Sequence, residues 1–306
     1  MKPRLALALA LALAAAMAAR TVVAGQLAPF RTETRLVVLR ATVKNSRGEL
    51  VTNLPQRAFT VYENGQRQPI ALFLREDIPV SLGLVIDNSG SMRPLRSRVE
   101  AAALAFARAS NAQDEMFVLN FGDKPRLDVP LTTDRHDLEA GIARVDAIGG
   151  TALRDALDAA ETYLRDHARR DRRVLLVITD GNDNASMVTP QQIEKAAEQS
   201  ETAIYAIGLF GDTDASAANS GRHELDRLTE RTGGVPYYPA SIDQIDTVAL
   251  EIAHQIRNQY TIAYTPLNQA LDGSYRRIRV NAVGPDRLVV RTRAGYRAPK
   301  GPTPTS

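Results

Sequence analysis

Two hydroxyl groups and a carboxylate lie within the short run Asp87-Asn88-Ser89-Gly90-Ser91. Oxygen atoms of this kind are the ligands that small hard cations prefer. The glycine lets the backbone bend tightly between the two serines. The run therefore predicts a loop that can hold a divalent ion, although the serines could instead cap the helix that is expected to follow.

Two further oxygen-bearing residues stand in comparable positions along the chain. Asp180 directly follows the hydrophobic run Val174–Thr179, and Thr151 follows two glycines and precedes a predicted helix. Taken singly, Asp180 reads as a turn aspartate and Thr151 as a helix N-cap. Taken with the Asp87 loop, they become candidates for the same ion site.

The elements that must position these residues begin at Val80, where short hydrophobic runs alternate with amphipathic stretches. The predicted strands are Val80–Ile86, Met116–Phe121, Val174–Thr179 and Ala203–Leu209. The predicted helices are Pro94–Ser110, Arg135–Val145, Leu153–His167, Pro190–Ser200, Glu224–Thr232 and Ile242–Asn258. This alternation indicates an α/β fold, a doubly wound and mostly parallel sheet with helices on both faces.

The carboxyl ends of parallel strands share one edge of such a sheet, and ligands bind in the crevice outside it. The loops of Asp87 and Asp180 both leave such ends, while Thr151 can enter from a neighbouring loop. We therefore expect these residues to meet at one edge, with Asp87 at the surface of the molecule.

Small β segments flank the α/β part, one at residues 30–77 and one at residues 259–297. In the first, Val37, Leu39, Ala41 and Val43 share one strand face, and Glu63-Asn64-Gly65 is a strong hairpin signal. In the second, the predicted strands are Tyr260–Tyr264, Tyr275–Val283 and Leu288–Arg293. The two segments could pair into one small layered subdomain, and residues 298–306 are expected to form a flexible tail.

The first residues have the order of a secretory leader. Lys2 and Arg4 precede an unbroken apolar run from Leu5 to Ala19, and small residues follow as far as Gly25. The run is shorter than the roughly 20 apolar residues of a spanning helix, so an uncleaved membrane anchor is the weaker alternative. We expect residues 1–24 to be a signal segment, cleaved after Ala18 or Ala24, and the mature chain to be periplasmic or extracellular with no membrane span.

Composition excludes several classes of protein. The chain has 306 residues, of which 44% are hydrophobic, so it can bury a substantial core. Three of the 38 basic residues lie in the leader, and the remainder balance the 35 acidic ones. With no basic stripe we expect no nucleic-acid partner. The absence of cysteine excludes disulfides and thiolate sites, and no pair among the four histidines has metal-ligand spacing.

The run Asp87-Asn88-Ser89-Gly90-Ser91 resembles the Asp-x-Ser-x-Ser element of von Willebrand factor type A domains. Thr151 and Asp180 resemble the threonine and the second aspartate of that family's metal-ion-dependent adhesion site. The resemblance runs over residues 80–258, and the flanking segments are similar to those of bacterial exported proteins that carry this domain. It implies that Asp87, Ser89, Ser91, Thr151 and Asp180 bind a divalent ion.

Mg²⁺ fits this oxygen set and Mn²⁺ could replace it. The function expected is metal-dependent protein binding, in which the ion accepts a carboxylate from a partner protein, with no catalytic residue. The alternative is a metal-dependent hydrolase that uses the same oxygens, but it needs a nucleophile or base beside the ion. Of the histidines, only His223 could lie near the predicted edge. An ion that only ties the loops together is a further alternative.

Two other stretches are relevant to the predicted edge. Residues Asp212–Asn219 are small and polar and follow a predicted strand, so they read as a mobile specificity loop or as an ordinary solvated connection. Tyr237 and Tyr238 are expected to pack as an edge strand rather than to bind a ligand.

Overall fold

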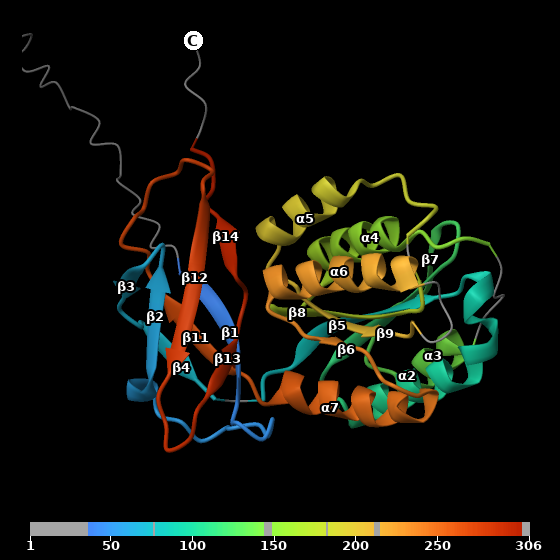
Figure 1. Cartoon of the computed structure of the whole chain (residues 1–306), viewed down its shortest axis with the longest axis horizontal. Helices are drawn as coiled ribbons and strands as arrows, with labels where there is room; N and C mark the ends of the chain where they lie inside the picture. Colours follow the sequence, from blue (N-terminus) through green and yellow to red (C-terminus); the bar gives the residue numbers. More distant parts are fainter. Residues whose placement is uncertain (1–35, 76, 144–148, 182, 211–214, 302–306) are drawn as a thin grey trace, which may run out of the picture. The chain divides into compact units, whose positions relative to one another are not determined.

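The computed structural model describes residues 36–75, 77–143, 149–181, 183–210 and 215–301 (Figure 1). The predicted leader, residues 1–24, lies outside this part of the chain. Within the described residues, no helix has both the length and the hydropathy needed to cross a membrane.

A six-stranded sheet forms the centre of the α/β part. Its strands, in order across the sheet, are β10 (Pro236–Tyr237), β9 (Ala203–Gly208), β8 (Arg172–Thr179), β5 (Val80–Asp87), β6 (Glu115–Phe121) and β7 (Pro125–Thr132). Neighbouring strands are parallel except for β6 and β7. Strand β5 is buried along its whole length, as expected for a parallel strand covered on both faces.

Helices cover both faces of this sheet (Figure 1). One hydrophobic core lies under α2 (Arg96–Ala109), α3 (Arg135–Ile142) and α7 (Ile245–Arg257). The core on the other face lies under α4 (Leu153–His167), α5 (Pro190–Gln199) and α6 (Ala215–Thr232). The α/β prediction, a doubly wound mostly parallel sheet, is confirmed.

Local sequence explains where these helices begin. In α4, the buried residues recur at helical spacing, so one apolar stripe faces the sheet. Helix α5 starts with a capping box, in which the Thr189 hydroxyl accepts from the Gln192 backbone and the Gln192 side chain accepts from the Thr189 backbone. Helix α2 follows a 3₁₀ turn, η2 (Gly90–Leu95), and α7 follows η3 (Ile242–Gln244).

The flanking β segments form two four-stranded antiparallel sheets that enclose a common hydrophobic core, a β-sandwich. The strands of the first, in order, are β13 (Val289–Arg291), β1 (Val37–Lys44), β11 (Tyr260–Tyr264) and β4 (Leu72–Leu74). Those of the second are β14 (Gly295–Arg297), β12 (Tyr275–Ala282), β2 (Phe59–Glu63), which follows η1 (Gln56–Ala58), and β3 (Gln66–Gln68). Because β1 pairs with β11 and β2 with β12, the predicted pairing of the two segments is confirmed.

The turn between β2 and β3 and a buried ion pair fix the second sheet. Asn64 and Gly65 have φ angles of 48° and 84°, the left-handed values that a tight hairpin turn of this kind requires. On the inner side, the Arg276 Nη1 atom lies 3.5 Å from Glu63 Oε1, and both side chains are buried. The Tyr264 and Tyr296 hydroxyls donate to Glu63 Oε2 at 2.8 and 3.0 Å. Both oxygens of the buried Glu63 carboxylate therefore have polar partners.

The structure corrects three sequence expectations and adds two strands. Strand β7 was not expected, because prolines interrupt it; they are tolerated at the edge of the sheet. Strand β14 was also missed. The predicted loop Asp212–Asn219 is wrong from Ala215 onward, where α6 begins, because alanines favour helix and Ala218 and Gly221 pack inward. Residues 211–214 lie outside the described chain.

The other corrections concern His223 and the C-terminus. His223 lies on the exposed side of α6 rather than in an edge loop. The flexible tail predicted for residues 298–306 is wrong for its first part, because the Ala298 and Gly301 backbone nitrogens donate to Ser274 and Leu271 at 2.9 and 2.8 Å. Residues 302–306 lie outside the described chain. Tyr237 does lie in an edge strand, β10, and Tyr238 follows that strand.

Candidate metal site

Asp87 is the last residue of β5, and its carboxylate is held from two sides. Oδ2 accepts from the Thr179 hydroxyl at 2.6 Å, and Oδ1 accepts from the Ser89 backbone nitrogen at 2.8 Å. The side chain is 0% exposed, so the expectation that Asp87 lies at the surface is wrong. The reason is that β5 is a central strand, flanked by β6 and β8, whose end is covered by the loops that leave its neighbours.

The three predicted segments meet at the carboxyl edge of the sheet. The Ser91 hydroxyl donates to Asp180 Oδ1 at 3.1 Å and lies 3.1 Å from the Ser89 hydroxyl. The Gly90 nitrogen donates to the Gly149 carbonyl at 3.1 Å, which joins the first loop to the segment that precedes Thr151. The Thr151 hydroxyl lies 3.7 Å from the position that a Cβ on Gly181 would take. All five residues named from the sequence therefore lie around one point of the edge.

This oxygen set fits a hard divalent cation. Neighbouring ligands of an octahedral Mg²⁺ lie about 2.9 Å apart, because each stands about 2.0 to 2.1 Å from the ion. The 3.1 Å separations that join Ser89, Ser91 and Asp180 are close to that value. Among the described residues, no three His, Cys, Asp or Glu side chains gather in a metal-binding group. An ion at this edge therefore needs the hydroxyl oxygens as well as the two carboxylates.

Burial controls the electrostatics of the two aspartates. Burial raises the pKa of Asp87 to about 6, the hydrogen bonds from Thr179 and Ser89 lower it in part, and the charge of Asp180 raises it further. Burial also raises the pKa of Asp180, against the lowering effect of the Ser91 hydroxyl. A positive charge placed beside such carboxylates favours their ionised forms.

Sequence reasoning missed two residues that shape the site. The first is Thr179, at the end of β8, the strand beside β5 in the sheet. Its hydroxyl donates a hydrogen bond to the Asp87 carboxylate. Asp123, which follows β6, accepts from the Gly150 nitrogen at 2.6 Å and so fixes the turn before Thr151. Gly149 has a φ of +88°, and a Cβ there would lie 2.3 Å from Asp123, so only glycine fits. The strand-end argument applied to β6 would have pointed to Asp123.

A third missed feature is the stretch from Asp183 to Val188, here called the 183–188 loop. Asn184 exchanges hydrogen bonds with Thr151, at 2.9 Å through its side chain and 3.0 Å through its backbone. The carboxylate of Asp183 is paired with Arg154, and that of Asp155 accepts from the Met187 and Val188 nitrogens. The loop is thus anchored to the start of α4, yet the Met187 side chain is 90% exposed.

Comparison with known proteins identifies the domain in which these residues lie. The family model of the von Willebrand factor type A domain matches residues 82–182, the stretch that holds all five candidate ligands. The chain contains a von Willebrand factor type A domain. A solved structure described as von Willebrand factor type A from Catenulispora acidiphila covers 89% of this chain and 75% of its own, with a TM-score of 0.52 and 14% identity. That likeness shows the fold.

Two further relatives match parts of the chain. Proximal thread matrix protein 1 from the mussel byssus, in a structure with a zinc-occupied metal-ion-dependent adhesion site motif, is 17% identical to this chain. The match covers 64% of this chain and 50% of that one, with a TM-score of 0.51. Calcium-activated chloride channel regulator 1 from Equus caballus is 27% identical over 192 residues, 60% of this chain. The match spans only 18% of the length of that curated relative.

Proposed function

We propose that the type A domain is a metal-dependent protein-binding module that captures an acidic group of a partner protein. The ion ligands in this proposal are Asp87, Ser89, Ser91, Thr151 and Asp180. The observation that supports it most directly is the continuous set of oxygens formed by Ser89, Ser91 and Asp180 where three loops meet. The zinc-occupied motif of the mussel protein supports a site of the same kind here.

The five proposed ligands have different roles in such a site. Asp87 is buried and fixed by Thr179, so it forms a rigid base. Ser91 is exposed, so the oxygen set is open to solvent on its side. Three of the five ligands are neutral hydroxyls, so the protein sets at most two negative charges against a divalent cation, and the ion can still accept a further oxygen ligand. A bound Mg²⁺ or Mn²⁺ would supply an open coordination position for the carboxylate of a partner.

The 183–188 loop gives the proposed docking surface an apolar contact. Met187 projects into solvent while the backbone on either side of it is held by Asp155. Because the loop backbone is already held, binding has to order the Met187 side chain but not the loop itself. Methionine also adapts well to different partner surfaces. We propose that Met187 packs against the partner beside the ion.

A metal-dependent hydrolase has less support as a proposal. Hydrolysis needs a base or nucleophile next to the ion, and His223, the histidine that the sequence offered for this edge, lies on the exposed side of α6. A turnover assay with phosphoester and peptide substrates separates the two functions, because a binding module retains its ligand unchanged.

Affinity capture from a cell-envelope extract tests the proposal, run in parallel with Mg²⁺ and with a chelator. The Asp180→Asn variant removes one charged ligand, and the Asp166→Asn variant is its control, because Asp166 is an exposed carboxylate at the far end of α4. We expect capture that requires Mg²⁺, is lost in Asp180→Asn and is retained in Asp166→Asn. Equal capture by both variants would contradict the proposed ligands.

We also propose that the protein is exported after cleavage of residues 1–24 and that residues 80–258 are the type A domain. Residues 30–77 and 259–297 would then be its β flanks. Mass spectrometry of the protein from envelope and culture fractions gives the mature N-terminus. A chain that still begins at Met1 in the cytoplasmic fraction would contradict export.

A further inference from the structure

The outer face of the second β-sandwich sheet carries an arginine cluster, here called the arginine face: Tyr62, Arg67, Tyr275, Arg277 and Arg279. Strand register places these side chains together. Tyr62 of β2 lies opposite Arg67 of β3 on one side and opposite Arg279 of β12 on the other. Side chains two residues apart in a strand share a face, so Tyr275 and Arg277 join Arg279.

Burial confirms which face this is. The alternate residues of β12 are Arg276, Ile278 and Val280, which are 1%, 6% and 7% exposed and point into the sandwich. Arg277 and Arg279, between them, are exposed. The outer face of the sheet therefore presents guanidinium groups at the spacing of strand residues.

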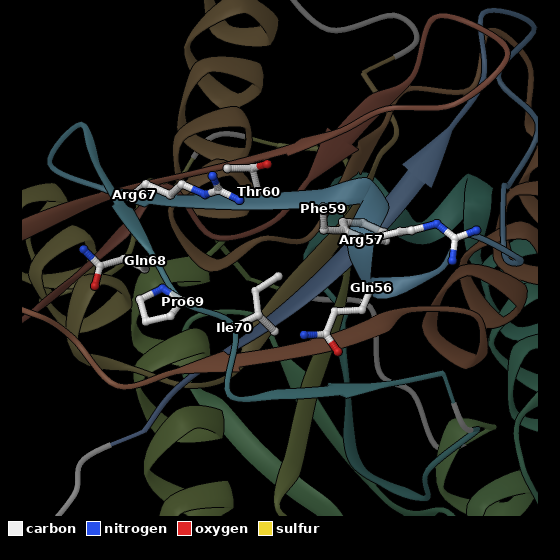
Figure 2. Close-up of a pocket in the computed structure, with 8 residues that line it drawn as sticks. All are labelled: Gln56, Arg57, Phe59, Thr60, Arg67, Gln68, Pro69 and Ile70. Carbon is white, nitrogen blue, oxygen red and sulfur yellow. The ribbon is translucent and has the colours of Figure 1, made fainter.

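Two open hollows adjoin this face, and neither is lined by an acidic residue. One, of about 490 Å³, is bounded by Tyr62, Tyr275, Arg277 and Arg279 and by the turn between β2 and β3. The other, of about 740 Å³, lies beside β3 and includes Arg67. Figure 2 shows Arg67 extending across β2 toward Thr60 at the rim of this second hollow.

The arginines of this face lack the ion pairs that some other arginines of the described chain form. Arg231, Arg276 and Arg297, for example, each form an ion pair with glutamate. Within the described part of the chain, no acidic side chain lies within ion-pair distance of Arg67, Arg277 or Arg279. Arg279 also lines a third hollow with Asp226 and Glu230 but makes no ion pair with either. The guanidinium charges of this face are therefore not neutralised by ion pairs and can attract an anionic ligand.

We propose that the arginine face binds an extended acidic segment of a partner protein, one with carboxylates at alternate residues. Such a segment places its carboxylates about 6.5 to 6.8 Å apart, the repeat that also separates Arg277 from Arg279 on β12. Guanidinium groups match carboxylates in charge and geometry. The Arg279 guanidinium lies 4.9 Å from the centre of the Tyr62 ring, so that ring is covered and does not offer a free stacking platform to a nucleobase.

Fluorescence anisotropy of short labelled peptides tests this inference with the whole chain. The probe alternates Glu and Thr, and its controls are a peptide of the same composition with all Glu residues in one block and a neutral peptide that alternates Gln and Thr. We expect the alternating acidic peptide to bind most tightly. Added salt weakens this binding, because exposed charges are screened, but a chelator leaves it unchanged. The metal-dependent capture proposed above has the opposite response to a chelator, so failure of one proposal is distinguishable from failure of the other.

The variant Arg277→Glu/Arg279→Glu should weaken binding of the alternating peptide about tenfold or more, because it replaces attraction with repulsion. Arg67→Glu changes a second strand and keeps the test valid if the double variant does not fold. Arg169→Glu is the matched control for Arg67→Glu, because both reverse one charge at an exposed position. Arg165→Glu/Arg169→Glu is the control of equal charge change for the double variant. Equal loss in Arg169→Glu, equal binding of the neutral peptide, or stronger competition by a single-stranded oligonucleotide would each overturn the inference.

Discussion

Under the two proposals, the carboxyl edge of the six-stranded sheet and the arginine face of the β-sandwich bind the same chemical group, a carboxylate, by different means. At the edge, the side-chain oxygens of Ser89, Ser91 and Asp180 lie close together, so the proposed binding of a carboxylate there requires a cation between it and these oxygens. On the arginine face, the positive charge belongs to the side chains Arg67, Arg277 and Arg279. Binding at the edge would therefore depend on metal and on the approach of loops from separate strands, whereas binding at the face would depend on strand register and ionic strength.

The largest expected effect is on the stability of the protein, through the buried ion pair of Arg276 and Glu63 beneath the arginine face. Arg276→Ala should destabilise the protein by about 3–5 kcal/mol, because it leaves the buried Glu63 carboxylate without its cation. The neighbouring Arg277→Ala should change stability by no more than about 0.5 kcal/mol, because that side chain is exposed. Chemical denaturation measures both. Similar costs for the two variants would show that Glu63 does not depend on Arg276.

Mg²⁺ should raise the stability of the folded protein by binding at the carboxyl edge of the sheet, and this gain should not depend on the arginine face. A cation that binds only the folded state adds about 2.7 kcal/mol at a hundredfold excess over its dissociation constant. Thermal unfolding with Mg²⁺ and with chelator should show this gain in the unmodified protein and in Arg277→Glu/Arg279→Glu. It should be absent from Asp180→Asn. Identical melting curves in Mg²⁺ and in chelator would contradict the proposed metal site.

Thr179→Val tests the support of the edge. The change removes the hydroxyl that donates to Asp87 at 2.6 Å, so it should cost about 1–3 kcal/mol and weaken Mg²⁺ binding about tenfold. Thr229→Val is the control, since its buried hydroxyl donates to the Leu225 carbonyl in α6, away from the site. Calorimetric titration with Mg²⁺ measures both variants. A similar loss of affinity in the two would argue against a specific role for Thr179.

The smallest expected effect is that of Met187→Ala. Because this side chain is 90% exposed, its loss should leave stability within about 0.5 kcal/mol of the unmodified protein. Metal-dependent capture of the partner should weaken about fivefold, and peptide binding to the arginine face should not change. Leu250→Ala on α7, where the side chain is 47% exposed, is the control. Unchanged capture would place the partner away from the 183–188 loop.

Much of the architecture could be predicted because it follows from local hydrophobic patterns in the sequence. The hydrophobic run Val80–Ile86 gave β5 and the apolar stripe from Leu153 gave α4, since periodicity reports which sides of an element are buried. Helix α6 was predicted too short, because its first turns are small and polar and are buried only where Ala218 and Gly221 meet the sheet. Strand β7 was missed because its prolines are acceptable only at an edge, and an edge is a property of the whole sheet.

The sequence by itself determined the fold class, the turn at Asn64 and Gly65, and which hydroxyl and carboxylate residues follow the strands that end at one edge. Those features depend on residue type and on neighbours in the chain. Only the tertiary structure decided that Asp87 is buried, that Thr179 holds it, and that Tyr62 lies between Arg67 and Arg279. These contacts join strands that are distant in the sequence, and their register is set by the packing of whole sheets rather than by any local pattern.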